Sequence, residues 1–198
     1  TTTWTLPPAS SLSAKAAEAL RQGMERVKAE GEARSREIKE RRAADAQQRL
    51  QEAERQIEDY QKVALLLRAS GNTKALRELA RQAAQLGRRV ADDLALVGEG
   101  ALASSETDSQ GILRGLNQAR QFAGHIAGQL RGLAALLKED EGARHEMEAT
   151  AKGVEDAAQA LPFKEISERV ARMSIERVHS ETSLAPSSSS AGHLPLIV

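Results

Sequence analysis

From residue 11 to residue 97 large apolar side chains recur at steps of three and four, the spacing that gives a helix one apolar face. Residues 11–68 contain no proline, so they predict one continuous helix about 87 Å long at about 1.5 Å per residue. Its apolar positions form two sets. The first set is Leu20, Met24, Val27, Gly31 and Ile38, and the second is Ala46, Leu50, Ala53, Ile57, Tyr60, Ala64 and Leu67.

The two sets are out of phase with each other. Ile38 and Ala46 are separated by two steps of four, which shifts the apolar stripe around the helix, as a stutter does in a coiled coil. Residues 39–45, between the sets, contain no large apolar side chain. We expect this middle segment to be solvated, bent or covered by a partner.

A turn separates this helix from the next. Gly71 suits a positive φ angle at a helix end, and Asn72 or Thr73 suits the start of a new helix. The apolar positions of the second helix are Leu76, Leu79, Ala83, Leu86, Val90, Leu94 and Val97. Such a short link predicts an antiparallel helical hairpin over residues 11–97.

The remainder of the chain predicts a second helical unit. Residues 98–111 contain three glycines, three acids and no base, and are interpreted as a linker. Three shorter helices follow over 112–179, with Pro162 between the last two. Their apolar positions are Ile112, Leu116, Ala119, Ala123, Ile126, Leu130, Leu133 and Leu137, then Met147, Ala151, Val154, Ala158 and Leu161, then Phe163, Ile166, Val170 and Met173. Residues 1–10 predict a flexible lead, and residues 180–198 a disordered tail.

The predicted fold class is therefore all-α: a long, coiled-coil-like antiparallel hairpin followed by a three-helix unit, in an elongated bundle. Composition agrees, because Ala, Glu, Lys, Leu and Arg account for 107 of the 198 residues. The first apolar set, from Leu20 to Ile38, needs a cover. We expect the helices of 112–179 to fold back on it; a second copy of the chain is the alternative.

Charge and residue types exclude several kinds of chemistry. The 28 basic and 28 acidic side chains balance, whereas binding to nucleic acid needs a basic surplus. The chain has no cysteine, which excludes disulfides and thiolate metal sites. A di-iron bundle needs two Glu-x-x-His motifs, and only Glu176 to His179 has this spacing. We therefore expect no catalytic group, cofactor, metal or small-molecule substrate.

The helix predicted over 112–138 has two unusual features. It contains four bases and no acid, whereas 139–161 contain seven acids and two bases, so we expect the two segments to pair. Its bases, which are also candidate contacts to an anionic surface, are Arg114, Arg120, Arg131 and Lys138. Gly124, Gly128 and Gly132 recur every four residues, a pattern typical of close helix packing. A membrane-binding or self-association face is the alternative interpretation.

These features favour a non-catalytic interaction or scaffold protein that binds another protein, or a second copy, through its apolar faces. The candidate packing or partner residues are Leu20, Met24, Val27, Ile38, Leu50, Ile57, Leu76 and Leu86. A peripheral membrane protein that uses the cationic 112–138 helix is one alternative, and a helical-bundle enzyme is another. No signal peptide or long apolar stretch is evident, so we expect a cytoplasmic location, with export without a cleaved signal as the alternative.

Overall fold

The structure is a computed structural model that describes residues 9–104 and 108–183, with side chains described for 13–104 and 108–175. Within these ranges it consists of five helices and no strand, so the predicted all-α class is confirmed. They are α1 (Ala9–Ala69), α2 (Thr73–Ala103), α3 (Ser109–Leu136), α4 (Glu141–Gln159) and α5 (Phe163–Ser183).

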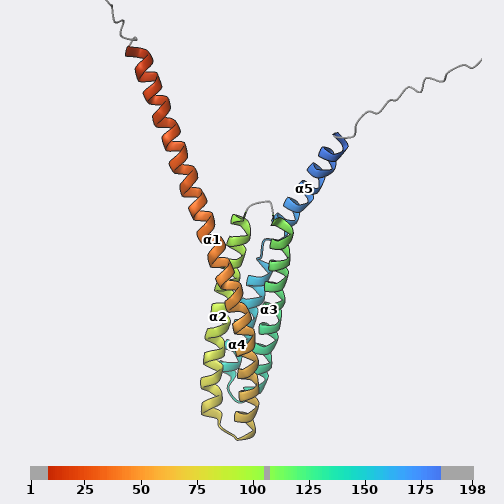
Figure 1. Cartoon of the computed structure of the whole chain (residues 1–198). Helices are drawn as coiled ribbons and strands as arrows, with labels where there is room; N and C mark the ends of the chain where they lie inside the picture. Colours follow the sequence, from red (N-terminus) through yellow and green to blue (C-terminus); the bar gives the residue numbers. More distant parts are fainter. Residues whose placement is uncertain (1–8, 105–107, 184–198) are drawn as a thin grey trace, which may run out of the picture.

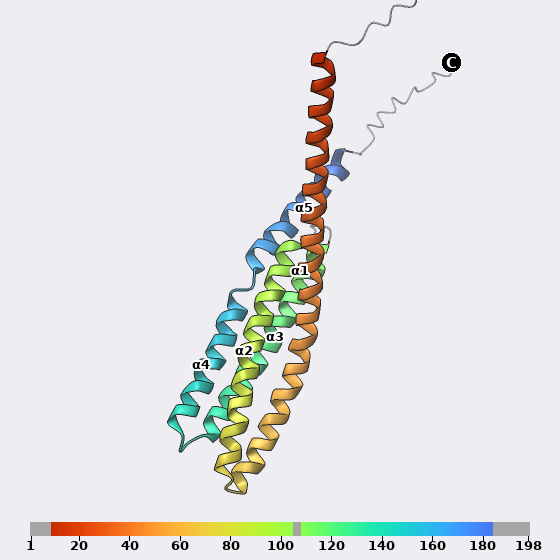
Figure 2. The ribbon, with the colours of Figure 1, turned by 90° about the vertical axis from the view of Figure 1, so that its left-hand side faces the viewer.

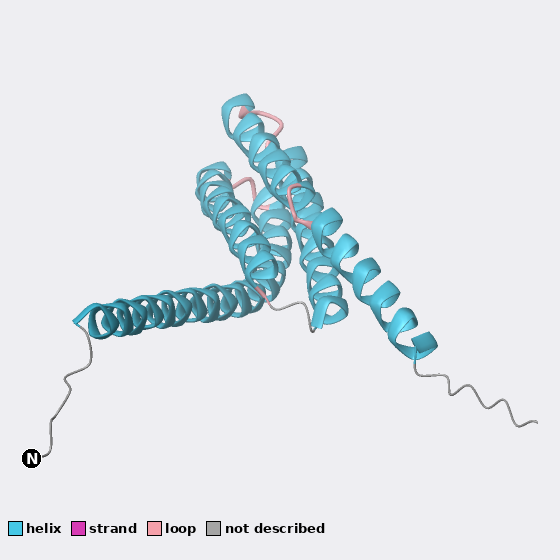
Figure 3. Ribbon diagram, turned by 90° about the horizontal axis from the view of Figure 1, so that it is seen from above, coloured by secondary structure: helices cyan, strands magenta, loops and turns pink. Residues whose placement is uncertain are grey.

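The helices form one elongated bundle with two projections (Figure 1). The C-terminal half of α1 packs against α2 and α3, and α4 packs against α2 and α3 on the other side. Turned by 90°, the molecule shows the N-terminal half of α1 standing clear of the bundle, with α5 leaving from the same end (Figure 2). The view from above shows these two helices pointing in different directions (Figure 3).

The core contains the apolar positions that the sequence pattern predicts. The second set of α1 and the positions of α2, α3 and α4 all face the bundle axis, because steps of three and four keep them on one side of each helix. The largest fully buried side chains are Leu50, Ile57, Val90, Leu94, Leu116, Ile126, Leu130, Met147, Val154 and Ile166. Leu86 is half-buried, against the edge of this core.

The turn between α1 and α2 is as predicted. Gly71 has a φ of 71°, the left-handed conformation in which a glycine ends a helix without strain. The Asn72 side chain accepts a hydrogen bond from the Ala75 amide at 3.1 Å and so caps α2. Gly71 ends α1 and Asn72 caps α2, and these two residues are enough to reverse the direction of the chain.

The predicted linker over 98–111 is wrong for most of its length, because α2 continues to Ala103 and its glycines are buried in helix contacts. A Cβ atom added at Gly100 would come within 2.2 Å of the Ala43 Cβ of α1, and one at Gly98 within 3.3 Å of the Pro162 ring. These glycines let neighbouring segments approach closely, rather than giving the chain flexibility.

The expectation that 112–179 fold back on Leu20–Ile38 is also wrong. Helix α3 lies along the other half of α1, where His125 meets Glu54 and the Gln61 amide lies against Gly132. The reason is length: α1 has 61 residues, whereas α2 has 31 and α3 has 28. Once the hairpin turn aligns α1 with α2, the bundle ends near residue 43 of α1. The two predicted units thus pack as one bundle.

The first and last helices extend beyond their predicted ends. Ala9 and Ser10, assigned to a flexible lead, belong to α1. Helix α5 extends to Ser183, four residues beyond the predicted end at 179. Residues 1–8 and 184–198 lie outside the described part of the chain, as do Ser105, Glu106 and Thr107 of the predicted linker.

Candidate interaction surface

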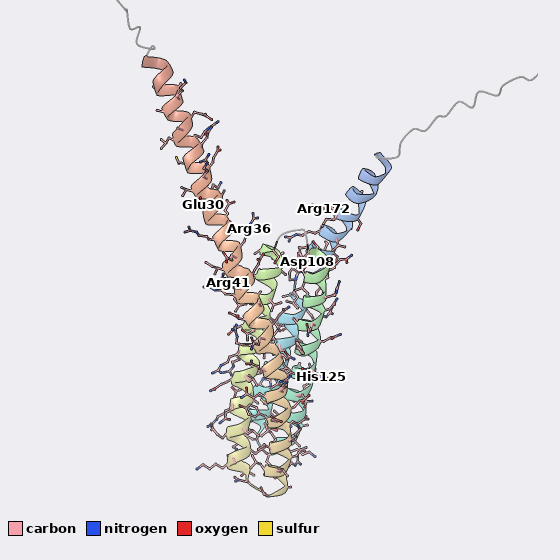
Figure 4. The ribbon with its side chains drawn as sticks, in the orientation of Figure 1. Glu30, Arg36, Arg41, Asp108, His125 and Arg172 are labelled. Atoms are coloured by element: carbon pink, nitrogen blue, oxygen red, sulfur yellow. The ribbon has the colours of Figure 1, made fainter. Side chains whose placement is uncertain are left out.

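The N-terminal half of α1 is a helical arm that projects from the bundle, and we call residues 13–42 the arm. Each of its residues is exposed, and the helix runs through it without interruption. Figure 4 shows Glu30, Arg36 and Arg41 along this projection. At about 1.5 Å per residue the arm is about 45 Å long. The middle segment, residues 39–45, remains helical, and its first four residues are exposed to solvent.

Four large apolar side chains form a stripe on the arm, and we call Leu20, Met24, Val27 and Ile38 the stripe. Their exposed fractions are 67%, 67%, 71% and 51%. Leu50, Ile57 and Leu76, which the sequence grouped with them, are instead buried in the bundle. The structure therefore divides the predicted packing faces into a core set and a solvent-facing set. Apolar surface that is exposed in a row marks a candidate binding site.

The arm meets the bundle at a small hollow of mixed polarity, which we call the root. Its volume is about 230 Å³. Its lining combines small residues, such as Ala43 and Gly100, with the polar residues Glu40, Gln47, Ser104 and Asp108. Ala43 of α1 lies directly against Gly100 of α2, and the Gln47 side chain lies against Gly115 of α3, so the helices approach closely beside this hollow. The root thus lies where the arm joins the bundle, on the C-terminal side of Ile38 along α1.

A second hollow of about 270 Å³ lies at the opposite end, beside the α1–α2 turn. Three cationic side chains, Arg68, Arg77 and Lys138, line it, and the two arginines are engaged. Arg77 Nε lies 2.7 Å from Asp140 Oδ2, and Arg68 donates to the Leu136 carbonyl oxygen at 3.2 Å. Asp140 also accepts from the Ala143 amide at the start of α4. These contacts join the two turns at this end of the bundle, which is a structural role.

The four bases of α3 have different surroundings. Arg131 donates twice to the Glu155 carboxylate of α4, at 2.5 and 2.6 Å. This hydrogen bonding lowers the pKa of Glu155 and raises that of Arg131. The Arg120 guanidinium lies 5.4 Å from the centre of the Phe163 ring of α5. Arg114 and Lys138 are exposed. The expected pairing of the basic and acidic helices thus takes place, through one bidentate ion pair.

The glycines of α3 do not form a continuous packing groove. A Cβ atom at Gly124 or Gly128 would meet nothing within 4 Å, so both face solvent. Only Gly132 makes a close contact, since its Cβ would come within 2.6 Å of the Gln61 amide nitrogen. The expectation of a groove covered by this chain is therefore wrong at two of the three positions. The face of α3 that carries Gly124 and Gly128 points away from the buried Leu130 side.

Several cross-helix contacts were not evident from the sequence. Arg49 of α1 donates to the Asp93 carboxylate of α2 at 2.7 and 3.0 Å, which raises the pKa of Arg49. Arg88 of α2 meets Glu146 of α4 at 2.5 Å. No local spacing links these residues, because each pair depends on how two helices are rotated against each other. Together they fix the order of helices around the core.

The described residues show neither a metal-binding cluster nor a membrane-spanning helix. They contain no cluster of three or more His, Asp or Glu side chains that could hold a metal ion. None of the helices, over the same residues, has a stretch apolar and long enough to cross a lipid bilayer. His125, at 2.7 Å from Glu54, joins α3 to α1. His179 lies among the residues whose side chains are not described.

Comparisons of the chain with protein families, with curated proteins and with solved structures found no match in any of the three. Function is therefore inferred from the arm and the stripe themselves.

Proposed function

We propose that the protein is a non-catalytic docking or scaffold protein, and that it binds a helix of another molecule along the stripe. The observation that carries this proposal is the exposure of Leu20, Met24, Val27 and Ile38 on a helix that extends about 45 Å beyond its own bundle. Their spacing is the one with which one helix packs against another.

The energetics of the stripe favour binding. Full burial of one large apolar side chain stabilises an assembly by about 1.5–3 kcal/mol, and each stripe residue is at least half exposed. A partner that covers all four would therefore gain several kcal/mol before the cost of association. The stripe faces water in the structure, so this stabilising free energy is obtained only when a partner covers it.

The bundle prepares the arm for this role. A short isolated helix is marginal in water because its first turn is costly to form. The arm is the continuation of a helix whose other half, from Ala46 to Leu67, packs its apolar face into the bundle core. It therefore needs no nucleation of its own, and a partner that binds it loses less free energy to the ordering of the arm.

Binding of α3 to an anionic membrane has less support. The apolar side of α3, including Ile126 and Leu130, is buried in the bundle, and Arg131 is paired with Glu155. Use of this helix would require the bundle to open. The arm needs no such change, and for this reason we prefer docking through the stripe.

Site-specific cross-linking tests the proposal. A photoreactive amino acid is placed at Val27 on the stripe, and in a matched variant at Arg36, on the opposite side of the arm. We expect cross-links from Val27 to map to a helical segment of a partner, and to be lost when Leu20→Ser and Met24→Ser are introduced. Cross-links of equal yield from both positions, or insensitive to the two serines, would contradict docking through the stripe.

A further inference from the structure

The stripe defines a heptad register for the arm. With Met24, Gly31 and Ile38 at position a, position d holds Leu20, Val27, Arg34 and Arg41. The positions that flank a two-helix contact are then e and g. Position e holds Arg21, Lys28, Ser35 and Arg42, and position g holds Gly23, Glu30 and Glu37.

The net positive charge of the arm lies on the side that carries the stripe. The positions that would face a partner, a, d, e and g, contain five bases and two acids, a surplus of three positive charges. The outer positions, b, c and f, contain four bases and four acids and are neutral. The bases on the partner side are Arg21, Lys28, Arg34, Arg41 and Arg42, and the acids are Glu30 and Glu37.

Part of this charge has no ion-pair partner among the described residues. Arg21 pairs with Glu18, and Arg41 pairs with Glu37 at 2.6 Å. Lys28, Arg34 and Arg42 form no ion pair with any side chain in the described ranges. A partner with acidic residues beside its apolar seam would therefore meet free cations on the arm.

A second copy fits this face poorly. In a parallel pair, equal positions face each other, so Arg34 meets Arg34 in the seam. In an antiparallel pair with Leu20 opposite Ile38, the flanks bring Lys28 beside Lys28 and Glu30 beside Glu30. Either arrangement also brings together two surfaces that each carry surplus positive charge, and such repulsion selects against self-pairing.

An anionic membrane also fits less well than a helix. A membrane-binding helix presents a broad apolar face to the lipid, whereas Gly31 and Arg34 interrupt the stripe. Glu30 and Glu37 directly flank it and would be repelled by acidic headgroups. The three-and-four spacing of the stripe is the feature that a second helix matches.

We infer that the partner of the arm is an amphipathic helix of another protein, with acidic residues along the one edge of its apolar seam that lies beside position e of the arm. This inference rests on the proposed docking function. It assigns the stripe to the apolar seam of that helix, and Arg21, Lys28 and Arg42 to its acidic edge.

Two peptide probes test the inference with the full chain. Both are four-heptad helices with Leu at positions a and d; the acidic probe has Glu at every e and g position, and the basic probe has Lys. Self-repulsion keeps each probe from pairing with itself. By fluorescence anisotropy we expect the acidic probe to bind at least about tenfold more tightly. Raising the ionic strength should weaken its binding, because salt shortens the range of exposed charges from about 30 Å at 0.01 M to about 3 Å at 1 M.

Charge reversal supplies the matched control. The triple variant Arg21→Glu, Lys28→Glu and Arg42→Glu should reverse the preference, so that the basic probe binds more tightly. A second triple variant, Lys15→Glu, Arg26→Glu and Arg36→Glu, makes the same charge change at outer positions and should keep the preference for the acidic probe. A reversal in both variants would attribute the selectivity to net charge and overturn the assignment of the flank.

Other outcomes are equally decisive. Tighter binding of the basic probe, failure of both probes, a dimer in light scattering that dissociates with Leu20→Ser, or binding to vesicles of anionic lipid through the stripe would each overturn the acidic-helix partner. If the cross-links from Val27 still depend on the stripe, any of these results would overturn only the acidic-helix partner, and docking through the stripe would remain supported. Loss of the Val27 cross-links would instead remove the proposed function.

Discussion

The division of α1 into an arm and a core half makes a quantitative prediction at two isoleucines. Ile57 is fully buried, whereas Ile38, in the same helix, is 51% exposed. Replacing a buried Ile with Ala costs about 2–5 kcal/mol, from lost burial and the cavity that remains. Substitutions at exposed positions usually stay within about 0.5 kcal/mol. The change in helix propensity is the same at both sites, so the difference between the two variants isolates burial.

Urea unfolding followed by far-ultraviolet circular dichroism measures this difference. With a slope of about 2 kcal/mol per molar urea, Ile57→Ala should lower the midpoint by about 1–2.5 M. Ile38→Ala should lower it by less than about 0.3 M on the same slope. Equal shifts would mean that residue 38 is covered in the free protein, and the arm would then not be an open surface. An unchanged midpoint for Ile57→Ala would refute the position of the core.

Two further predictions concern glycine and pH. Gly100→Ala should destabilise the bundle, because the added Cβ would lie 2.2 Å from that of Ala43. Gly128→Ala, at an open position of α3, should instead stabilise it by about 1 kcal/mol. Thermal melting compares the two variants, and a stabilising effect of Gly100→Ala would contradict the close contact. The folded-state pKa of Glu155 is lowered by its hydrogen bonds from Arg131, so its contribution is complete above the ordinary carboxyl pKa of about 4.5 and is lost as pH falls through the folded-state value. Stability measured against pH should therefore fall less steeply on the acid side for Glu155→Gln, and identical curves would argue against the pair.

Local structure was largely predictable from the sequence. The five helices, the stop at Gly71 and the cap at Asn72 all follow from short-range spacing and from the conformations that single residues favour. The residues on the apolar side of each helix were also correct, because position along a helix fixes direction around it. Residues that are close together in the sequence decide whether a segment is helical and which of its side chains share one side.

The glycines show where this reasoning fails. Composition predicts a linker at Gly98 and Gly100, yet they lie in α2 at close contacts with neighbouring segments. Spacing predicts a packing groove at Gly124 and Gly128, yet they face solvent. A glycine permits either close approach or flexibility, and its own position in the sequence does not say which. Only the neighbouring helix decides.

The candidate site shows the same division. The sequence by itself determined that Leu20, Met24, Val27 and Ile38 share one side of a helix, as do Leu50 and Ile57, because the three-and-four spacing is local. It gave no means of separating the first group, which stays in water, from the second, which forms the core. The tertiary structure decided this. The turn at Gly71 aligns the end of α1 with α2, and α1 is about twice as long as any helix available to cover it, so the half farthest from the turn is left exposed.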